Sequence, residues 1–297
     1  MPVVASGGSP DDPRDGRPAS LGGLVLVSTP IGNLGDISLR ARSVLDTCDL
    51  ILCEDTRRTA RLLTALDIRS RTETLHEHNE DARIASVLER LRANQTVALV
   101  SDAGTPLVSD PGYRLVRAAI EADLTVTAIP GPNAAVTALI LSGLPPLPFM
   151  FLGFPPAKQG ARRAAFSGLR AAERAGLSTT LIWHEAPHRL IETFVDLLEV
   201  FGDRSAAVAR ELTKRFEAIE RGKLSYLADL FAREPPRGEI TLLIGPPETD
   251  DLEDLDGRLR AALETQTVKD AAALVSMATG LPRKVVYARA LEIHEEN

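Results

Sequence analysis

The 297-residue sequence is poor in cysteine and in aromatic residues. Its two cysteines, Cys48 and Cys53, are too few for a disulfide framework or a cysteine-rich metal site. Aromatic residues make up 4% of the chain, so a core must consist mainly of Leu, Val, Ile and Ala. The hydrophobic share of 44% is that of an ordinary globular chain, long enough for one large or two medium domains.

Long hydrophobic runs are also missing. No apolar stretch approaches the ~18 residues that cross a bilayer. The N-terminal segment is rich in Gly, Pro, Ser and Asp and lacks the apolar part of a signal peptide. We therefore expect a cytoplasmic protein with no membrane segment and with a disordered tail over residues 1–22.

Positive charge is in deficit, with 34 Lys and Arg against 41 Asp and Glu and a net charge of −7. This balance excludes proteins that coat nucleic acid through a broad basic surface. It leaves room for a local basic cleft, because Lys and Arg gather in segments 57–61, 158–174 and 210–223. Basic residues beside a cleft suit RNA phosphates, although one such cluster more often forms only a solvated helix face.

Common nucleotide-binding and metal-binding motifs are absent as well. No Gly-x-Gly-x-x-Gly follows the first predicted strand, and no phosphate loop ends in Gly-Lys-Ser or Gly-Lys-Thr. These absences disfavour dinucleotide oxidoreductases and phosphate-loop ATPases or GTPases. The cluster of His76 and His78 has no third ligand at metal-binding spacing, so we expect no metal site.

Short apolar runs alternate with amphipathic segments along the first half of the chain. This alternation, with short connections, predicts an α/β fold with a parallel sheet covered on both faces. The predicted strands are 24–27, 50–53, 97–100 and 125–129. The predicted helices are 38–47, 57–66, 81–92, 113–121 and 133–142.

Three prolines within residues 145–148 predict a domain boundary, because proline interrupts both helices and central strands. A second α/β set follows, and the acidic segment 248–256 then leads into an all-helical remainder with Ala271, Leu274, Val275 and Ala278 on one stripe. The predicted strands of this set are 149–152, 179–183, 206–211, 216–220 and 239–244, and its helices are 162–174, 190–201 and 224–233. The predicted parts are an N-terminal α/β domain 23–145, a C-terminal α/β domain 146–247, and an acidic linker and helical tail 248–297.

Four polar loops follow predicted strands of the first domain. Gly, Pro, Asp and Asn also make ordinary turns, so composition alone does not identify a site. The carboxyl ends of parallel strands meet at one edge of a sheet, however, and ligands of open α/β sheets bind there. The loops are 28–36, 54–58, 101–112 and 130–133.

Several long motifs carry a family resemblance. They are VSTPIGNLGD at 27–36, CEDTR at 53–57, VSDAGTPLVSDPG at 100–112, IPGP at 129–132, FLGF at 151–154, HEAPHR at 184–189, RELTK at 210–214 and RGE at 237–239. Over about residues 24–297 the chain resembles the small-subunit ribosomal RNA methyltransferases of the tetrapyrrole methylase superfamily. It departs at Ala186, where that family usually has serine.

The resemblance implies two α/β domains with the methyl donor in the cleft between them, plus a small helical C-terminal tail. It further implies a homodimer that uses S-adenosylmethionine to methylate the 2′-oxygen of a cytidine ribose in 16S rRNA, in the decoding region of the 30S subunit. The donor-binding residues carried over are Pro30, Ala103, Gly104, Thr105, Val108, Asp110, Asn133, Ala134, Trp183, Ala209 and Thr241. The residues expected to contact RNA are Asn33, Arg57, Arg58, His76, His78, Arg162, Arg163, His188, Arg189 and Lys214.

The catalytic base stays open at this point. A ribose hydroxyl is a poor nucleophile unless a base removes its proton or the enzyme orients it well. Asp55 and Thr56 have a second interpretation, as the cap of the following helix. The candidate catalytic carboxylates are Glu54, Asp55, Asp102 and Glu185, with His184 and His188 as further candidates.

Two other functions are compatible with the sequence. A methylase of small tetrapyrroles would share the fold and the donor, and a non-catalytic ribosome-binding factor could retain the fold alone. The basic helix after Pro156, the segment HEHNE at 76–80 and the helical tail favour RNA over a porphyrin. The complete GTPLVSDPG and PGPN loops argue against loss of the donor site.

Overall fold

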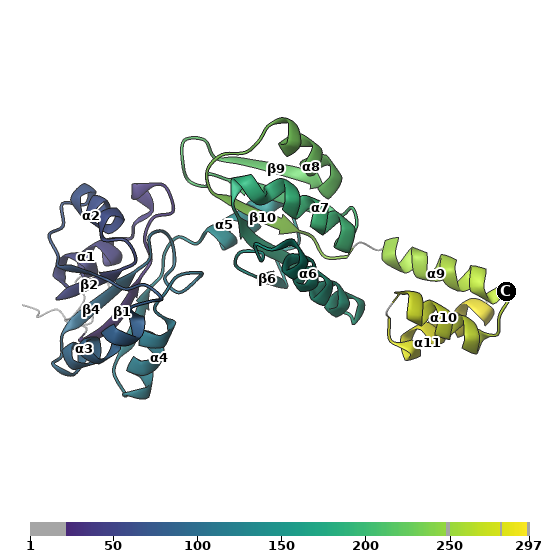
Figure 1. Ribbon diagram of the computed structural model, residues 1–297, viewed down its shortest axis with the longest axis horizontal. Helices are drawn as coiled ribbons and strands as arrows, with labels where there is room; N and C mark the ends of the chain where they lie inside the picture. The colour runs from purple at the N-terminus through teal and green to yellow at the C-terminus, as the bar shows by residue number, and fades with distance from the viewer. Residues whose placement is uncertain (1–21, 248–249, 280, 296–297) are drawn as a thin grey trace, which may run out of the picture. The chain divides into compact units, whose positions relative to one another are not determined.

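The chain forms two compact units that divide between Ala134 and Ala135 (Figure 1). The structure, a computed structural model, describes residues 22–247, 250–279 and 281–295. The tail predicted over 1–22 therefore lies outside the described residues except for Gly22. The four-part domain division stays a prediction. Its proline-rich boundary follows helix α5 (Ala134–Ser142), which belongs to the second unit from Ala135 onward.

The first unit contains the predicted parallel sheet. Its strands are β1 (Gly23–Val27), β2 (Leu50–Cys53), β3 (Thr72–Thr74), β4 (Thr96–Val100) and β5 (Val126–Ile129). They lie in the order β3-β2-β4-β1-β5, and every pair is parallel. The short edge strand β3 was not predicted, because its sequence Thr-Glu-Thr holds no apolar residue.

Helices cover both faces of this sheet. The helices are α1 (Leu39–Thr47), α2 (Thr56–Ala65), α3 (Glu80–Arg92) and α4 (Tyr113–Glu121). Alternate side chains of one strand enter different cores: Val25 packs with Val44 of α1, whereas Leu24 packs with Leu115 of α4. Two of the helices begin at side-chain caps, where Ser38 Oγ accepts from Ala41 N at 3.0 Å and Asp55 Oδ1 from Arg57 N at 2.8 Å.

The second unit holds a mixed sheet. Its strands are β6 (Phe149–Phe151), β7 (Thr180–Glu185), β8 (Ser205–Arg210), β9 (Ala218–Lys223) and β10 (Ile240–Ile244). The order is β6-β7-β10-β8-β9, in which β6 and β7 are parallel and the other pairs antiparallel. Helices α6 (Gln159–Arg174), α7 (Leu190–Phe201) and α8 (Leu224–Arg233) contribute Phe166, Phe194 and Phe231 to its core.

The C-terminal segment is helical, as predicted. It comprises α9 (Asp250–Leu263), α10 (Val268–Thr279) and α11 (Arg283–Glu295), and these three helices share one small core. Ala271 and Val275 are buried, but the prediction for Leu274 was wrong, since this side chain is exposed and Ala272 is buried instead. Ala278 lies outside the described side chains. Within the described ranges, no helix combines the length and apolar composition that crossing a membrane requires.

A buried ion network ties α6 to α7. Arg162 Nε donates to Asp196 Oδ2 at 2.6 Å, and both side chains are fully buried. Arg163 Nε donates to the other oxygen, Asp196 Oδ1, also at 2.6 Å. Burial alone would raise the pKa of Asp196, but the hydrogen bonds from Arg163 and Arg162 outweigh it and lower the pKa. The network therefore depends on an ionised Asp196.

Replacing Asp196 with alanine should lower the free energy of unfolding by about 3 kcal/mol, because Arg162 would remain buried without its carboxylate. Urea denaturation at pH 7 followed by circular dichroism measures this loss. Arg174→Ala is the matched control, since Arg174 is exposed on the same helix. Equal stability of Asp196→Ala and the wild type would contradict the assigned role of the network.

Candidate functional site

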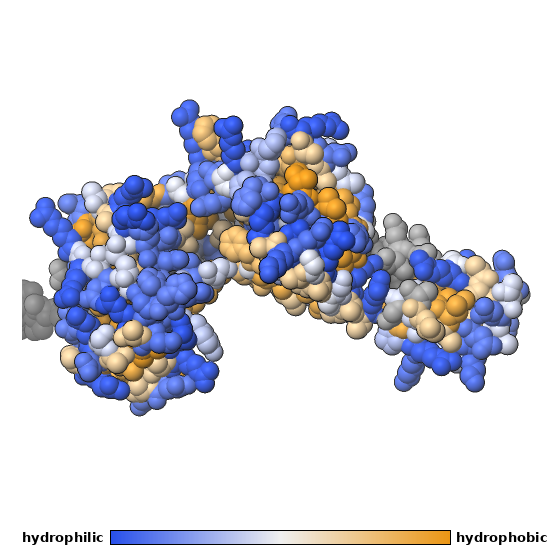
Figure 2. Space-filling model, viewed as in Figure 1, coloured by the Kyte–Doolittle hydropathy of each residue, from blue (hydrophilic) through white to orange (hydrophobic). Residues whose placement is uncertain are grey.

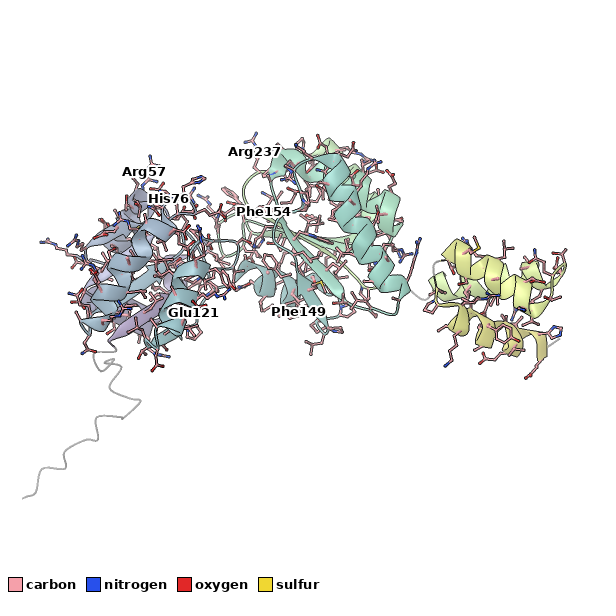
Figure 3. The ribbon with its side chains drawn as sticks, turned by 60° about the horizontal axis from the view of Figure 1, so that its bottom comes forward. Arg57, His76, Glu121, Phe149, Phe154 and Arg237 are labelled. Carbon is pink, nitrogen blue, oxygen red and sulfur yellow. The ribbon has the colours of Figure 1, made fainter. Side chains whose placement is uncertain are left out.

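The carboxyl ends of the five parallel strands bring five loops to one edge of the first unit. Four of them are the predicted loops. The fifth, residues 75–79 after β3, joins the edge because β3 runs parallel to β2. Figure 3 shows Arg57 and His76 at one end of the first unit and Glu121 at the other. The HEHNE segment thus lies on the edge that the other loops form.

The loops after β1 and β4 are joined by a two-residue antiparallel bridge. Thr29 N donates to Gly104 O at 2.9 Å, and Gly104 N donates back to Thr29 O at 3.1 Å. Ser101 is buried beneath the bridge, where its Oγ donates to Gly104 O at 3.2 Å. This bridge holds the start of loop 101–112 against the end of β1.

A second set of contacts joins loop 101–112 to loop 130–133. Thr105 Oγ1 donates to Pro132 O at 3.1 Å, and Asn133 Nδ2 donates to Thr105 Oγ1 at 3.4 Å. Gly131 approaches the β1 end so closely that an added Cβ would lie 2.8 Å from Ser28 Cβ. Three of the edge loops therefore form one connected backbone frame.

Loop 101–112 contains several left-handed residues. Gly104 has a φ of +83° and Gly112 a φ of +120°. Leu107 and Ser109 have φ values of +70° and +71°, which are sterically unfavourable for residues with a side chain. Such strained positions gather at binding and catalytic sites, because the surrounding fold must hold them. A Cβ on Gly104 would also lie 3.2 Å from Ile31 Cγ2. Gly104 is therefore confined by both conformation and space.

Three carboxylates influence one another along this edge. Burial raises the pKa of Asp110 to about 6, and the charges of Glu54 and Asp102 add to the effect. Partial desolvation, followed by the charge of Asp102, also raises the pKa of Glu54, although much of this side chain is exposed. Asp102 Oδ1 accepts from Asp55 N at 3.2 Å, and its Oδ2 lies 3.3 Å from Arg58 Nη1.

The described part of the chain holds no group of three or more His, Cys, Asp or Glu side chains that could bind a metal ion. The acidic side chains of Glu54, Asp102 and Asp110 favour a cationic ligand at this edge.

Asp55 serves as the cap of α2, which is the second interpretation of its sequence position. It also forms a bidentate pair with Arg57, at 3.1 Å from Nε and 2.8 Å from Nη2. These hydrogen bonds lower its pKa to about 2. A carboxylate that is so weakly basic is a poor proton acceptor near neutral pH.

The loop after β3 is built around Asn79. Its Oδ1 accepts from His76 N at 2.9 Å, and its Nδ2 donates to Thr74 O at 3.2 Å. His76 Nδ1 is buried and has no hydrogen-bond partner in the described part of the chain, whereas His78 is exposed. The two imidazole rings lie 6.1 Å apart.

In the second unit, three residues of neighbouring strands lie side by side. Thr241 of β10 is paired with His184 of β7 and with Ala209 of β8. His184 Nδ1 lies 3.2 Å from Thr241 Oγ1. Burial lowers the pKa of His184, whose ring packs 4.8 Å from that of Phe151. His184 and Thr241 therefore share one face of the sheet.

Trp183 lies in the hydrophobic core of the second unit. Its indole is 2% exposed and packs edge-on against Phe166 of α6 at 5.5 Å. Because successive strand residues point to opposite faces, its side chain is turned away from the face of His184 and Thr241. Only the backbone of Trp183 is available to a ligand on that face.

Glu185 and Arg189 hold the loop that follows β7. Glu185 is buried, accepts from Thr193 Oγ1 at 2.6 Å, and lies 3.4 Å from Arg189 Nε. Arg189 Nη2 donates to Pro155 O at 2.6 Å. Of the residues that the sequence predicted in this loop, only His188 is exposed. Glu185 is therefore a structural side chain, and Arg189, which is half-buried, also holds this loop in place.

The expectation that Arg162 contacts RNA is wrong, because its side chain is completely buried against Asp196. Arg163 is partly exposed but already paired with Asp196 and Glu199. Lys214 Nζ likewise lies 2.9 Å from Glu211 Oε1 and 3.0 Å from Glu239 Oε2. Sequence spacing could not reveal these partners, which lie up to 36 positions away.

The remaining predicted residues lie on the edge loops of the first unit or in the first turn of the helices that follow these loops. Asn33 caps a short 3-10 turn by accepting from Gly35 N at 3.0 Å. Arg57, Arg58 and Ala103 are exposed. The half-buried residues are Pro30, Thr105, Val108, Asp110, Asn133 and Ala134.

Comparison with known proteins gives the same family for both parts of the chain. Residues 23–228 match the model described as Tetrapyrrole (Corrin/Porphyrin) Methylases, and residues 249–294 match the RsmI C-terminal HTH domain. Two similar relatives are each named Ribosomal RNA small subunit methyltransferase I. The one from Micromonospora olivasterospora is 47% identical over 93% of this chain and 89% of its own. The one from Mesorhizobium japonicum is 44% identical over 92% of each chain.

Solved structures show the same fold. Diphthine synthase aligns with a TM-score of 0.56 at 15% identity, over 75% of this chain and 89% of its own. Uroporphyrin-III C-methyl transferase from Thermus thermophilus, complexed with S-adenyl homocysteine, aligns with a TM-score of 0.50 at 18% identity, over 75% and 96%. The predicted fold class, two α/β parts of the tetrapyrrole methylase type with a helical tail, is confirmed.

Asp110→Asn should stabilise the protein at pH 7.5 by about 1 kcal/mol, after allowance for partial exposure. With its pKa raised to about 6, Asp110 keeps its proton in the folded protein at pH values where the unfolded chain has lost it. Its stabilising contribution is thus complete below pH ~4 and is lost as the pH rises through 6. Urea denaturation at several pH values should show the variant and the wild type converging near pH 4. Asp229→Asn, at an exposed position of α8, is the control.

Proposed function

The chain belongs to the tetrapyrrole methylase family, and on that premise we propose that it methylates the 2′-oxygen of a cytidine ribose in the decoding region of 16S rRNA. It is an rRNA methyltransferase that uses S-adenosylmethionine. The observation that carries this function is the match to small-subunit rRNA methyltransferases over more than nine-tenths of the chain, including the helical tail. The cytidine, its 2′-oxygen and the 30S context are parts of the proposal.

The first unit supports a donor site on its edge loops. S-adenosylmethionine carries a sulfonium and an ammonium group, and the acidic group of Glu54, Asp102 and Asp110 provides the opposite charge. The strained frame around Gly104 leaves backbone groups and small side chains beside that charge. The proposed donor-binding residues there are Pro30, Ala103, Gly104, Thr105, Val108, Asp110, Asn133 and Ala134.

In the second unit we retain Ala209 and Thr241 as proposed donor-binding residues, because they lie on the sheet face that His184 occupies. Trp183 is retained only for its backbone, since its indole is part of the core.

The bound donor supplies a methyl group on a sulfonium, and the protein must orient the ribose hydroxyl and accept its proton. Of the candidate carboxylates, Glu54 fits the second task best. It is exposed at the end of β2, makes no hydrogen bond within the described part of the chain, and has a raised pKa. Asp102 acts as a positioning residue that holds Asp55 N and Arg58.

The substrate side of the proposal concerns RNA within the 30S subunit. Arg57 and Arg58 keep most of their side chains exposed despite their carboxylate partners, so phosphates can reach them. Arg162 is withdrawn from this set. The other RNA-contacting residues proposed are Asn33, His76, His78, Arg163, His188, Arg189 and Lys214.

We also retain the homodimer, which exposed apolar side chains of the second unit support. Val136 and Ile140 of α5 are 45% and 71% exposed, and Leu147 and Phe149, at the start of edge strand β6, are exposed as well. Figure 2 shows hydrophobic residues reaching the surface of this unit, whereas hydrophilic residues cover most of the visible face of the first. Exposed apolar patches of this kind mark association surfaces.

Incubation with tritiated S-adenosylmethionine should place label in 30S subunits and leave uroporphyrinogen unlabelled. Nuclease digestion and chromatography of the nucleosides should then recover the label as 2′-O-methylcytidine. Label in the porphyrin alone would establish a small-molecule methylase. Donor binding without label in either substrate would instead favour a ribosome-binding factor.

Gly104→Val should reduce donor affinity at least about tenfold. A branched side chain cannot adopt φ +83° without strain, and it would press against Ile31. Isothermal calorimetry with S-adenosylmethionine measures the change, and circular dichroism verifies that the variant is folded. Gly168→Val is the matched control, because an added Cβ at Gly168 in α6 meets nothing within 4 Å. Unchanged affinity in a folded Gly104→Val protein would remove this loop from the donor site.

A further inference from the structure

Two exposed aromatic residues lie at one edge of the second sheet. This edge is formed by the ends of four neighbouring strands, β7, β10, β8 and β9. The residues paired across these ends are, in that order, Glu185, Ile240, Arg210 and Ala218. Phe216 immediately precedes this edge on the loop from β8 to β9. The chain after β6 continues beside β7, where His184 N donates to Gly153 O at 2.9 Å, and this places Phe154 at the same edge.

Both rings are turned to solvent. Phe216 is 67% and Phe154 55% exposed, whereas Phe166, Phe194 and Phe231 are in the core. The guanidinium of Arg215 lies over the ring of Phe216, 5.5 Å from its centroid. A flat ring beside a guanidinium is the combination on which unpaired nucleic-acid bases stack.

The loop that carries Phe216 is rigidly braced. Thr213 N donates to Glu217 Oε2 at 2.7 Å, and Glu217 N donates to Lys214 O at 3.1 Å. Glu211 and Thr213 both adopt left-handed conformations, with φ +50° and +64°. The neighbouring Glu239 N donates to Glu211 Oε1 at 2.9 Å. An exposed ring on such a loop is preorganised for a ligand, because little further entropy is lost on binding.

The charges at this edge favour an anionic partner. The carboxylates at this edge already have partners. Glu211 and Glu239 are paired with Lys214. Glu217 accepts a hydrogen bond from the backbone of Thr213. Arg237 is exposed and forms no ion pair within the described part of the chain. Figure 3 shows Arg237 projecting away from the ribbon. Arg215 and Arg237 therefore remain available for phosphates next to the exposed rings.

We propose that this edge binds unpaired RNA bases, with Phe216 as the ring on which one base stacks and Arg215 and Arg237 as contacts to the adjoining phosphates. A base within a duplex hides its faces, so the surface selects single-stranded or looped RNA. The proposal rests on the rRNA methyltransferase function and specifies the form of RNA that the protein recognises.

The test compares the wild type with Phe216→Ala, Phe216→Leu and Phe216→Trp. Tyr226→Ala is the matched control, because Tyr226 is a similarly exposed ring at the start of α8, beyond the opposite end of β9. One measurement is the KM for unmethylated 30S subunits with tritiated S-adenosylmethionine. The other is fluorescence quenching of a single-stranded 2-aminopurine oligoribonucleotide, with the corresponding duplex as competitor.

We expect Phe216→Ala and Phe216→Leu to raise KM and weaken oligonucleotide binding about tenfold, with kcat and donor affinity unchanged. Phe216→Trp should restore both, Tyr226→Ala should change neither, and the duplex should not compete. If the wild type methylates 30S subunits and Phe216→Ala matches it, the stacking surface is wrong while the proposed function stands. A higher KM with unchanged quenching would assign the ring to a protein of the subunit and also overturn the proposal.

If the wild type methylates no 30S subunits, the proposed function fails. The stacking proposal is then tested by the oligonucleotide measurement alone. Quenching that Phe216→Ala abolishes and Phe216→Trp restores would still support base stacking. Absence of quenching by the wild type would refute it.

Discussion

The parallel pairing of the first sheet is the constraint on which the candidate site depends. Because β1 is parallel to both β4 and β5, the loops that follow these strands must leave from the same edge. The reciprocal hydrogen bonds of Thr29 and Gly104 then hold two of these loops together. The unusual backbone of loop 101–112 is possible only inside this frame, since isolated left-handed residues such as Leu107 are unfavourable.

The distribution of charge differs between the loop regions of the two sheets. Along the first edge, desolvation and then the charges of neighbouring carboxylates raise the pKa of Asp110 and Glu54, and this cluster of acids suits a cationic ligand. At the edge of the second sheet, acidic residues brace loops and neutralise Lys214, which leaves Arg215 and Arg237 exposed. The net charge of −7 therefore says little about ligands, because the local distribution of the charges decides what binds.

The fold by itself does not select the substrate. Similar structures include a uroporphyrin-III methyltransferase and diphthine synthase at 15–21% identity, so one architecture serves different methyl acceptors. Relatives that match this chain over about nine-tenths of its length are named small-subunit rRNA methyltransferases, and residues 249–294 match the RsmI C-terminal HTH domain. We therefore expect side chains on the loops to select the methyl acceptor, and Phe216 is the one that we propose.

The sequence by itself determined many of the local elements and the polar loops that follow the parallel strands. An apolar run predicted β2, and helix periodicity predicted α4 and α7. Polar motifs after the strands predicted the loops at the carboxyl edge of the first sheet. Each of these signals lies in neighbouring residues of the sequence. Only the tertiary structure decided that Arg162 is buried, that Trp183 faces the core and that polar β3 completes the sheet. Each depends on partners distant in sequence, such as Asp196 for Arg162, and burial and pairing energies exist only after those partners meet.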